Sequence, residues 1–144
     1  MDGPLIYVIA GEPSGDFLGG RLMAALIIEK DNQLKFRGVG GQDMTSQGLI
    51  SLFPMSDLSV MGIMEVVPKI PKLLGRISEV VKDIIDKKPD VVITIDAPDF
   101  CFRVAKRLKG KKIPVIHYVA PTVWAWRQGR AAKIAKFLDH IFCL

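Results

Sequence analysis

Two carboxylates stand directly after an apolar run in the second half of the chain. Residues 89–95 have the composition of a buried β-strand, and Asp96 and Asp99 follow it, with Pro98 between them. In open α/β sheets, ligands bind in the crevice outside the carboxyl ends of the strands. A carboxylate at that edge is placed to take a proton from an incoming hydroxyl group. Asp99 also suits the N-cap of the next helix, so Asp96 is the better candidate for a general base.

A second polar turn, Gly-Glu-Pro-Ser-Gly-Asp at residues 11–16, follows the first apolar run. It lacks the Gly-Lys-Ser/Thr ending of a P-loop and the Gly-x-Gly-x-x-Gly spacing of a dinucleotide site. Glu12 and Asp16 would repel a phosphate held at the turn, so their carboxylates suit sugar hydroxyls better. Ser14 is predicted to cap the following helix, and Asp16 to favour its positive end. A plain turn with a helix cap is the alternative interpretation.

The third polar stretch, residues 117–127, follows the next predicted strand and therefore reaches the same edge of the sheet. His117 lies inside an apolar run, so a hydrogen-bonded core histidine is the default interpretation. Trp124 and Trp126 are separated by one residue. These large aromatics are expected either to stack on a sugar ring or to pack over the sheet. Two arginines, Arg127 and Arg130, are able to bind phosphate through two hydrogen bonds each. An arginine near a helix start is also commonly just solvated.

Residues 52–74 form an unusually apolar, methionine-containing segment that two interpretations fit equally. It is either part of the core or an adaptable surface for acyl chains or a membrane. Lys69, Lys72 and Arg76 beside it would suit an anionic membrane face. The residues predicted to make the membrane or acyl-chain contact are Met61, Ile63, Met64, Val66, Val67, Ile70 and Leu73.

Strands and helices alternate along the chain, which predicts an α/β fold with a doubly wound, mostly parallel, Rossmann-like sheet. A short glycine cluster, residues 38–41, is interpreted as a structural turn in preference to a place where a ligand approaches the backbone. Strands are expected at residues 5–10, 35–39, 89–95, 113–119 and from 140. Helices are expected from Ser14 to 29, briefly to 44, from 69 to 88, from Asp99 to 108 and at 129–138.

Composition narrows the possible partners. The chain has 144 residues and a formal net charge of +5, but residues 1–68 carry four Lys/Arg against eight Asp/Glu, and residues 69–144 carry sixteen against seven. A basic half indicates an anionic partner or a solvated lysine-rich face.

No apolar run reaches the ~20 residues that cross a bilayer, and the two cysteines form no metal or disulfide pattern. Nucleic acid is excluded as a partner because the basic residues are spread over helices without interleaved aromatics.

Four motifs in order carry a resemblance to a known family. They are Ala-Gly-Glu-Pro-Ser-Gly-Asp at 10–16, Val-Met-Gly-Ile-Met-Glu-Val at 60–66, Ile-Asp-Ala-Pro-Asp-Phe at 95–100, and His-Tyr-Val-Ala-Pro-Thr-Val-Trp-Ala-Trp-Arg at 117–127. Together they closely resemble lipid-A-disaccharide synthase. That family is similar to inverting glycosyltransferases of the GT-B type, which have two Rossmann-like domains with a cleft between them.

The resemblance implies transfer of 2,3-diacylglucosamine from UDP-2,3-diacylglucosamine to 2,3-diacylglucosamine 1-phosphate (lipid X), with release of UDP. It implies no metal or other cofactor, and a peripheral location on the cytoplasmic face of the inner membrane of Gram-negative bacteria, against its lipid surface. It also implies that Asp96, in the Ile-Asp-Ala-Pro motif, is the catalytic base. The residues expected to bind substrate are Glu12, Ser14, Asp16, Asp99, Trp124, Arg127 and Arg130.

Residues 1–144 are expected to form the N-terminal, acceptor-side domain, with the C-terminal UDP-sugar-binding domain absent from this chain. The isolated fragment is therefore expected to have little or no transferase activity. Two alternatives stay open: a non-catalytic module that binds acyl-sugar phosphate or anionic lipid, and another open α/β protein such as a flavin- or nucleotide-binding regulator. The second alternative needs a phosphate loop, which the sequence does not contain.

Overall fold

The computed structural model describes residues 3–31, 33–58, 63–118 and 138–142. Its elements alternate as the sequence predicts. In chain order they are β1 (Leu5–Ala10), α1 (Pro13–Glu29), β2 (Lys35–Val39), α2 (Gln42–Thr45), the 3-10 helix η1 (Met55–Leu58), α3 (Ile63–Lys87), β3 (Val91–Ile95), α4 (Pro98–Arg107), β4 (Val115–Tyr118) and β5 (His140–Phe142).

The five strands form one sheet in the order β2-β1-β3-β4-β5, and every neighbouring pair is parallel. The predicted doubly wound parallel sheet is thus confirmed. From β1 the chain moves outward to β2 and then returns past β1 to β3, so the strand order reverses between β1 and β3. This reversal is the topological switch point, where α/β folds of this kind open a crevice for ligands.

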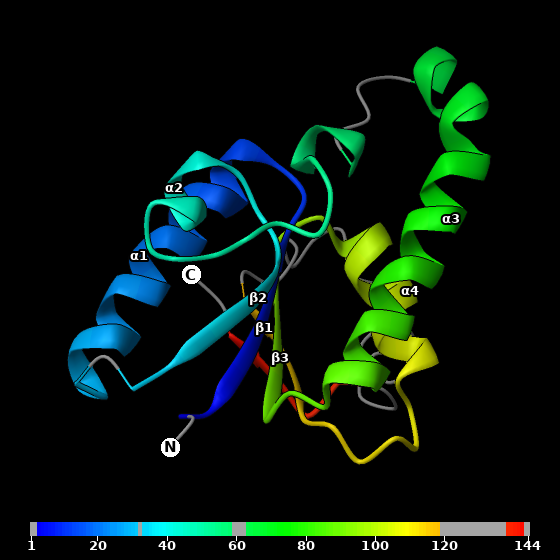
Figure 1. Ribbon diagram of the computed structural model, residues 1–144. Helices are drawn as coiled ribbons and strands as arrows, with labels where there is room; N and C mark the ends of the chain where they lie inside the picture. The colour runs from blue at the N-terminus through cyan, green and yellow to red at the C-terminus, as the bar shows by residue number, and fades with distance from the viewer. Residues whose placement is uncertain (1–2, 32, 59–62, 119–137, 143–144) are drawn as a thin grey trace.

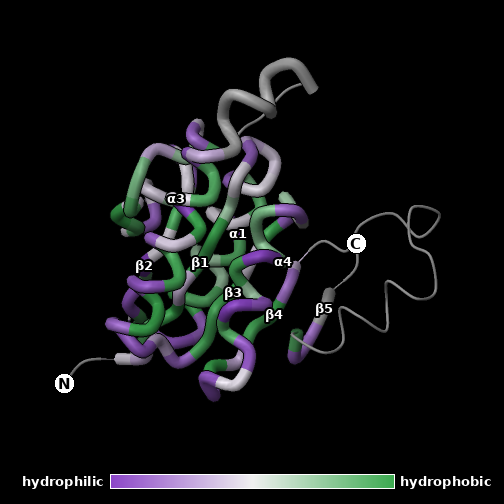
Figure 2. Tube along the Cα trace, turned by 90° about the vertical axis from the view of Figure 1, so that its right-hand side faces the viewer, coloured by the Kyte–Doolittle hydropathy of each residue, from purple (hydrophilic) through white to green (hydrophobic). Residues whose placement is uncertain are grey.

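Each face of the sheet carries its own helices and its own core. Figure 1 shows α1 and α2 on one side of the strands and α3 and α4 on the other. Successive side chains of a strand alternate between faces. On β1, Val8 therefore packs with Met23 of α1 and Met44 of α2, while Tyr7 packs with Ile84 of α3. The apolar residues of β1 and β3 consequently lie in the middle of the molecule (Figure 2).

Helix α3 begins earlier than the sequence predicts. The sequence analysis placed its start at residue 69, after Pro68, whereas the helix runs from Ile63 through Pro68 and Pro71 to Lys87. The prediction was wrong because each proline removes one backbone hydrogen bond but keeps a helical φ. The apolar spacing of the segment favours one continuous helix.

Candidate functional site

The exits of β1 and β3 lie side by side at the switch point. Ala10, the last residue of β1, is in register with Ile95, the last residue of β3. The 11–16 turn and the Asp96 turn therefore meet at the carboxyl edge of the sheet. Both carboxylate-bearing segments therefore stand at the edge where open α/β sheets bind their ligands.

The helices that leave these two turns begin one or two residues earlier than predicted. Glu12 is the N-cap of α1 and Ala97 the N-cap of α4, and neither makes a side-chain capping hydrogen bond. The predicted N-caps, Ser14 and Asp99, were wrong, since both lie inside the first helical turn. Proline occupies the first turn of each helix because its fixed φ suits that position and its missing N–H would have no partner there.

Asp96 stands on a strained strand-to-helix turn. It has φ +51° and Ala97 has φ +39°, both left-handed. For residues with a Cβ, each such conformation costs about 1–2 kcal/mol, and strain of this kind concentrates at functional sites. The Asp96 N–H donates to the Tyr118 carbonyl at 3.1 Å. Ala97 packs against Gly11, where a Cβ would lie 3.0 Å from the Ala97 Cβ.

The α1 turn reaches the Asp96 side chain directly. The Ser14 hydroxyl donates a hydrogen bond of 3.4 Å to Oδ2 of Asp96. Gly15 faces β3 here, and a Cβ on it would lie at ordinary contact distance, 3.4 Å, from the Ile95 carbonyl oxygen. Ser14 and the half-buried Asp96 are thus brought together across the switch point, and Glu12 belongs to the same turn as Ser14. Asp99 is exposed in the first turn of α4.

The Cys101 thiol lies beneath this turn and is fully buried. Burial, and to a smaller extent the negative charge of Asp96, raises the pKa of the Cys101 thiol far above its ordinary range. A thiol with a raised pKa stays protonated at neutral pH and is a poor nucleophile. Cys101 is therefore a poor candidate for chemistry at this edge.

Asp16 serves the fold, and its prediction as a substrate contact needs correction. Its carboxylate is 5% exposed and accepts hydrogen bonds from the backbone N–H groups of Gly41, Asp43 and Met44 at 2.8, 3.0 and 3.0 Å. These groups are free donors at the start of α2. Asp16 of α1 thereby caps a different helix, and its oxygens are occupied.

The glycine cluster at residues 38–41 is a structural turn, as the sequence analysis favoured. Gly38 has φ +145°, and a Cβ on it would lie 1.9 Å from the Val8 carbonyl oxygen. Gly41 gives its N–H to Asp16. The close approach that these glycines permit is to the protein's own atoms: the Val8 backbone at Gly38, and the side chains of Met44 and Asp16 at Gly40 and Gly41.

His117 is the hydrogen-bonded core histidine that the sequence analysis took as the default. It is fully buried on β4, and its Nδ1 lies 2.7 Å from the Thr94 hydroxyl oxygen of β3. The Phe102 ring meets the imidazole edge-on, with centroids 4.8 Å apart. Trp124, Arg127 and Arg130 of the same predicted stretch lie outside the described residues.

Parts of the apolar 52–74 segment belong to the core. Phe53 and Leu58 are buried, and Leu73 packs against the same cluster, whereas Leu74 is 44% exposed. Met61 lies outside the described residues, as do the side chains of Ile63, Met64, Val66, Val67 and Ile70.

Two of the cations that would suit an anionic membrane face bind a carboxylate of the protein itself. Lys72 Nζ lies 3.1 Å from Oδ1 of Asp57, and an Arg76 guanidinium nitrogen lies 2.7 Å from Oδ2. The Lys72 ammonium, followed by the Arg76 guanidinium, holds the pKa of Asp57 below its usual range. Arg76 also lies over the Phe53 ring, 4.5 Å from its centroid. These contacts join η1 to α3 beside the crevice.

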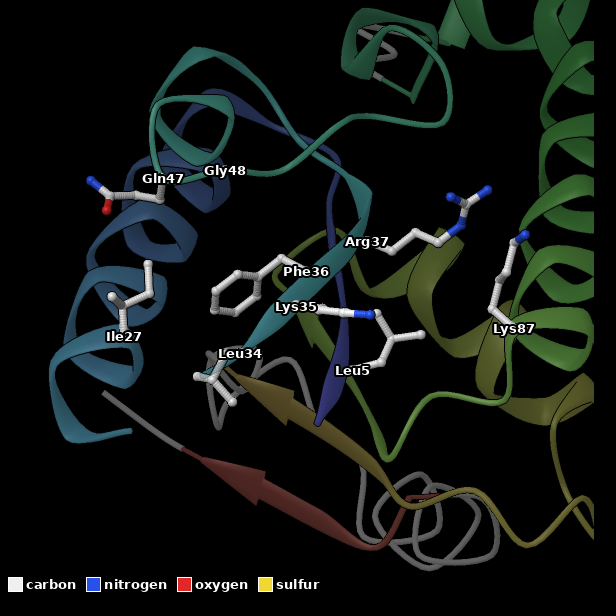
Figure 3. Close-up of a pocket in the computed structure, with 9 residues that line it drawn as sticks. All are labelled: Leu5, Ile27, Leu34, Lys35, Phe36, Arg37, Gln47, Gly48 and Lys87. Carbon is white, nitrogen blue, oxygen red and sulfur yellow. The ribbon is translucent and has the colours of Figure 1, made fainter. Parts of the chain in front are cut away.

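A hollow along the edge strand β2 was missed by sequence reasoning. It encloses about 570 Å³, and Figure 3 shows the side chains that line it. Ile27, Leu34 and Phe36 contribute apolar surface, and Lys35 and Lys87 contribute positive charge. Its walls come from the first residues of β1 and β2 and the last turns of α1 and α3, away from Asp96. Nothing in the local sequence patterns signals it, because tertiary packing brings these segments together.

The described part of the chain contains neither a membrane-spanning helix nor a cluster of metal-binding side chains. No helix there is long and apolar enough to cross a membrane. No group of three or more His, Cys, Asp or Glu side chains in that part is arranged to hold a metal ion.

Comparison with known proteins gives a strong family match. The family model for lipid-A-disaccharide synthetase matches residues 6–144. The lipid-A-disaccharide synthase of Rhodospirillum centenum is 58% identical over 142 residues, which cover 97% of this chain and 35% of that protein. The synthase of Paramagnetospirillum magneticum is 53% identical over 142 residues, covering 97% of this chain and 36% of that protein. The chain thus spans about a third of the length of these curated relatives.

Solved structures support the fold at low sequence identity. The UDP-GlcNAc 2-epimerase of Neisseria meningitidis bound to UDP-GlcNAc has a TM-score of 0.60 at 16% identity, over 97% of this chain and 39% of that one. The S. aureus MnaA–UDP co-structure has a TM-score of 0.60 at 15% identity, over 97% of this chain and 37% of that one. At such identities the likeness concerns the fold, the Rossmann-like sheet described above.

Proposed function

The chain belongs to the lipid-A-disaccharide synthetase family, and from this premise we propose that it is the acceptor-side domain of a glycosyltransferase of lipid A biosynthesis. The full-length protein would transfer 2,3-diacylglucosamine from UDP-2,3-diacylglucosamine to lipid X. The products are lipid A disaccharide 1-phosphate and UDP. A C-terminal domain outside these 144 residues would supply most of the UDP-sugar site.

The position of Asp96 is the single observation that carries the proposal. Its carboxylate lies at the switch point of the sheet, on a turn held in left-handed backbone geometry. We propose that Asp96 removes the proton of the acceptor 6-hydroxyl as its oxygen attacks the anomeric carbon of the donor sugar. The new glycosidic bond forms as the bond to the UDP oxygen breaks, and UDP leaves with the electron pair. One displacement inverts the anomeric centre from α to β.

The acceptor sugar would lie over the turns of α1 and α4. Glu12 and Asp99 are exposed carboxylates of these turns, and both suit the hydroxyl groups of a sugar. Asp16 is not included, since its oxygens bind the α2 backbone. We keep Trp124 as a sugar contact and Arg127 and Arg130 as contacts for the acceptor phosphate. The apolar residues at positions 61, 63, 64, 66, 67 and 70 would receive acyl chains or touch the cytoplasmic face of the inner membrane, where the protein would act peripherally.

The test is a transferase assay on a full-length chimera. In it, these 144 residues replace the matching segment of the Rhodospirillum centenum synthase, which is 58% identical over 142 residues. Asp96→Asn is expected to lower kcat by about a hundredfold or more, the loss typical for a general base. Unchanged circular dichroism and melting temperature would show that the fold is intact.

Asp99→Asn is the matched control, because it removes a carboxylate from the same strand-to-helix turn. It is expected to change kcat by less than about tenfold, the effect of losing one substrate contact. The isolated 144-residue chain is expected to show little or no turnover. If kcat of the Asp96→Asn chimera stays within threefold of that of the unmodified chimera, the role of Asp96 is refuted. Asp99 or Glu12 then becomes the candidate base.

A further inference from the structure

Asp96 has a partner on the other side of the switch point. Ser14 lies 82 positions earlier in the chain, and its hydroxyl donates to Oδ2 of Asp96 at 3.4 Å. The two residues belong to different strand exits, since Ser14 follows β1 and Asp96 follows β3. The contact is therefore a product of the tertiary fold, and neither turn forms it alone.

Rigid elements hold the Ser14 hydroxyl in this place. Ser14 lies in the first turn of α1, behind Pro13. Gly11 lets the turn before the helix lie close to Ala97, because an added Cβ would lie 3.0 Å from the Ala97 Cβ. Two residues further on, the three hydrogen bonds of Asp16 fasten the same helical turn to α2. A side chain on such a support loses little entropy when it makes a fixed contact.

Capping does not explain Ser14. The N-cap position of α1 is Glu12, and Ser14 lies inside the first helical turn, where its hydroxyl is not in the capping position. Ser14 is exposed, and Asp96 is half-buried. A polar pair at a solvent-facing crevice contributes little to stability. The geometry of the pair is better explained by the effect of the hydrogen bond on the orientation of the Asp96 carboxylate.

A hydrogen bond to one carboxylate oxygen distinguishes it from the other. A carboxylate can rotate about its Cβ–Cγ bond, and a general base needs one oxygen held within reach of the proton that it removes. With Oδ2 bound to Ser14, rotation is restricted and Oδ1 is left to accept the proton. The 3.4 Å separation is long, as catalytic hydrogen bonds often are before substrate binds, and they shorten in the closed complex.

We infer that Ser14 is a positioning residue for Asp96: its hydroxyl fixes one oxygen of the carboxylate so that the other faces the acceptor hydroxyl. The inference rests on the proposed function and refines it, because Ser14 then acts through Asp96 and does not bind the sugar. Its effect belongs to the chemical step. Substrate affinity should not depend on it.

The experiment is a double-mutant cycle in the full-length chimera, with UDP-2,3-diacylglucosamine and lipid X as substrates. Ser14→Ala is expected to lower kcat by about tenfold, the effect of one hydrogen bond to a charged group. KM for both substrates should stay within twofold. Ser14→Thr keeps a hydroxyl and should recover most of the rate. In the Asp96→Asn background, Ser14→Ala should cost less than twofold, because the group it positions is already gone.

Ser78→Ala is the matched control, since Ser78 also lies on a helix and accepts one side-chain hydrogen bond, from Arg107 at 2.9 Å. It should leave kcat and KM unchanged. The inference is overturned if Ser14→Ala keeps the full kcat, if it raises KM at constant kcat, or if its loss is undiminished in the Asp96→Asn background. Failure of the proposed function looks different: Asp96→Asn itself would then retain activity.

Discussion

Arg37 and Asp83 form a two-pronged ion pair between the edge strand β2 and helix α3. Arg37 Nε lies 2.6 Å from Oδ2 of Asp83, and an outer guanidinium nitrogen lies 2.9 Å from Oδ1. The buried Tyr7 of β1 adds its hydroxyl, which donates to Oδ2 at 2.8 Å. Two strands and one helix thus converge on a single carboxylate, which fixes α3 on its face of the sheet.

The ion pair makes stability depend on pH. Burial opposes ionisation of Asp83, but the hydrogen bonds from Arg37 and Tyr7 outweigh it and lower the pKa of Asp83 below its usual value. Burial, followed by the bond to Asp83, raises the pKa of Tyr7. A group whose pKa is lowered by folding stabilises the fold above its unfolded pKa. That stabilisation is lost as the pH falls through the lower, folded value.

Asp83→Asn is therefore expected to lower the free energy of unfolding by about 1–3 kcal/mol at pH 7, the loss for a hydrogen-bonded charge. Urea denaturation of both proteins over a range of pH would measure this. The difference should hold down to about pH 5 and shrink below about pH 4, where Asp83 becomes protonated first in the unfolded chain and, at still lower pH, in the folded protein. Asp86→Asn, an exposed change on the same helix, should stay within about 0.5 kcal/mol. A pH-independent difference would contradict the explanation.

Asp16→Asn tests the link between α1 and α2. One amide oxygen cannot replace two carboxylate oxygens that accept three N–H bonds, and the amide NH₂ would face other donors. The expected loss is about 2–3 kcal/mol of unfolding free energy, because buried donors are left unsatisfied. Thermal melting should show it as a clear fall in Tm. Asp43→Asn, at an exposed position in the first turn of α2, should melt close to the wild type, and equal melting of all three proteins would refute the assignment.

Alanine substitutions at two glycines distinguish the effect of backbone strain on stability from the effect of a steric clash. Gly38 and Gly48 both have positive φ, but a Cβ would lie 1.9 Å from the Val8 carbonyl oxygen at Gly38 and meets nothing within 4 Å at Gly48. Gly48→Ala should cost about 1–2 kcal/mol, the price of a left-handed residue with a Cβ. Gly38→Ala adds overpacking against backbone and should cost about 3 kcal/mol or more. Chemical denaturation measures the free energy of unfolding of both variants. Equal losses would show that the β1–β2 contact accommodates the added Cβ at Gly38 without a steric penalty.

Sequence patterns predicted most of the architecture. The strands at residues 5–10 and 35–39 have the predicted bounds, because short runs of β-branched and aromatic residues ended by glycine carry a strong local signal. The alternation of strands and helices was enough to predict the parallel sheet. The sequence also shows that Asp96 comes directly after a buried strand. In a parallel α/β sheet this position is at the carboxyl edge, where ligands bind.

Helix starts could not be predicted in the same way. Serine and aspartate are favoured N-caps by local statistics, and those statistics pointed to Ser14 and Asp99. The structure instead caps α4 with Ala97 in left-handed geometry, which is tolerated because Ala97 packs against Gly11 from another strand exit. Helix α3 likewise continues through two prolines that local rules treat as a break.

The amino-acid sequence by itself determined which segments are buried strands, which edge of the sheet carries the polar turns, and that Asp96 stands there. Tertiary structure decided which polar groups of these turns meet. Asp16 and Ser14 are two residues apart in one motif, yet Asp16 binds the start of α2 and Ser14 reaches Asp96. The physical reason is that a polar group forms its hydrogen bond with whichever partner lies within reach, and packing of distant segments decides which partner that is.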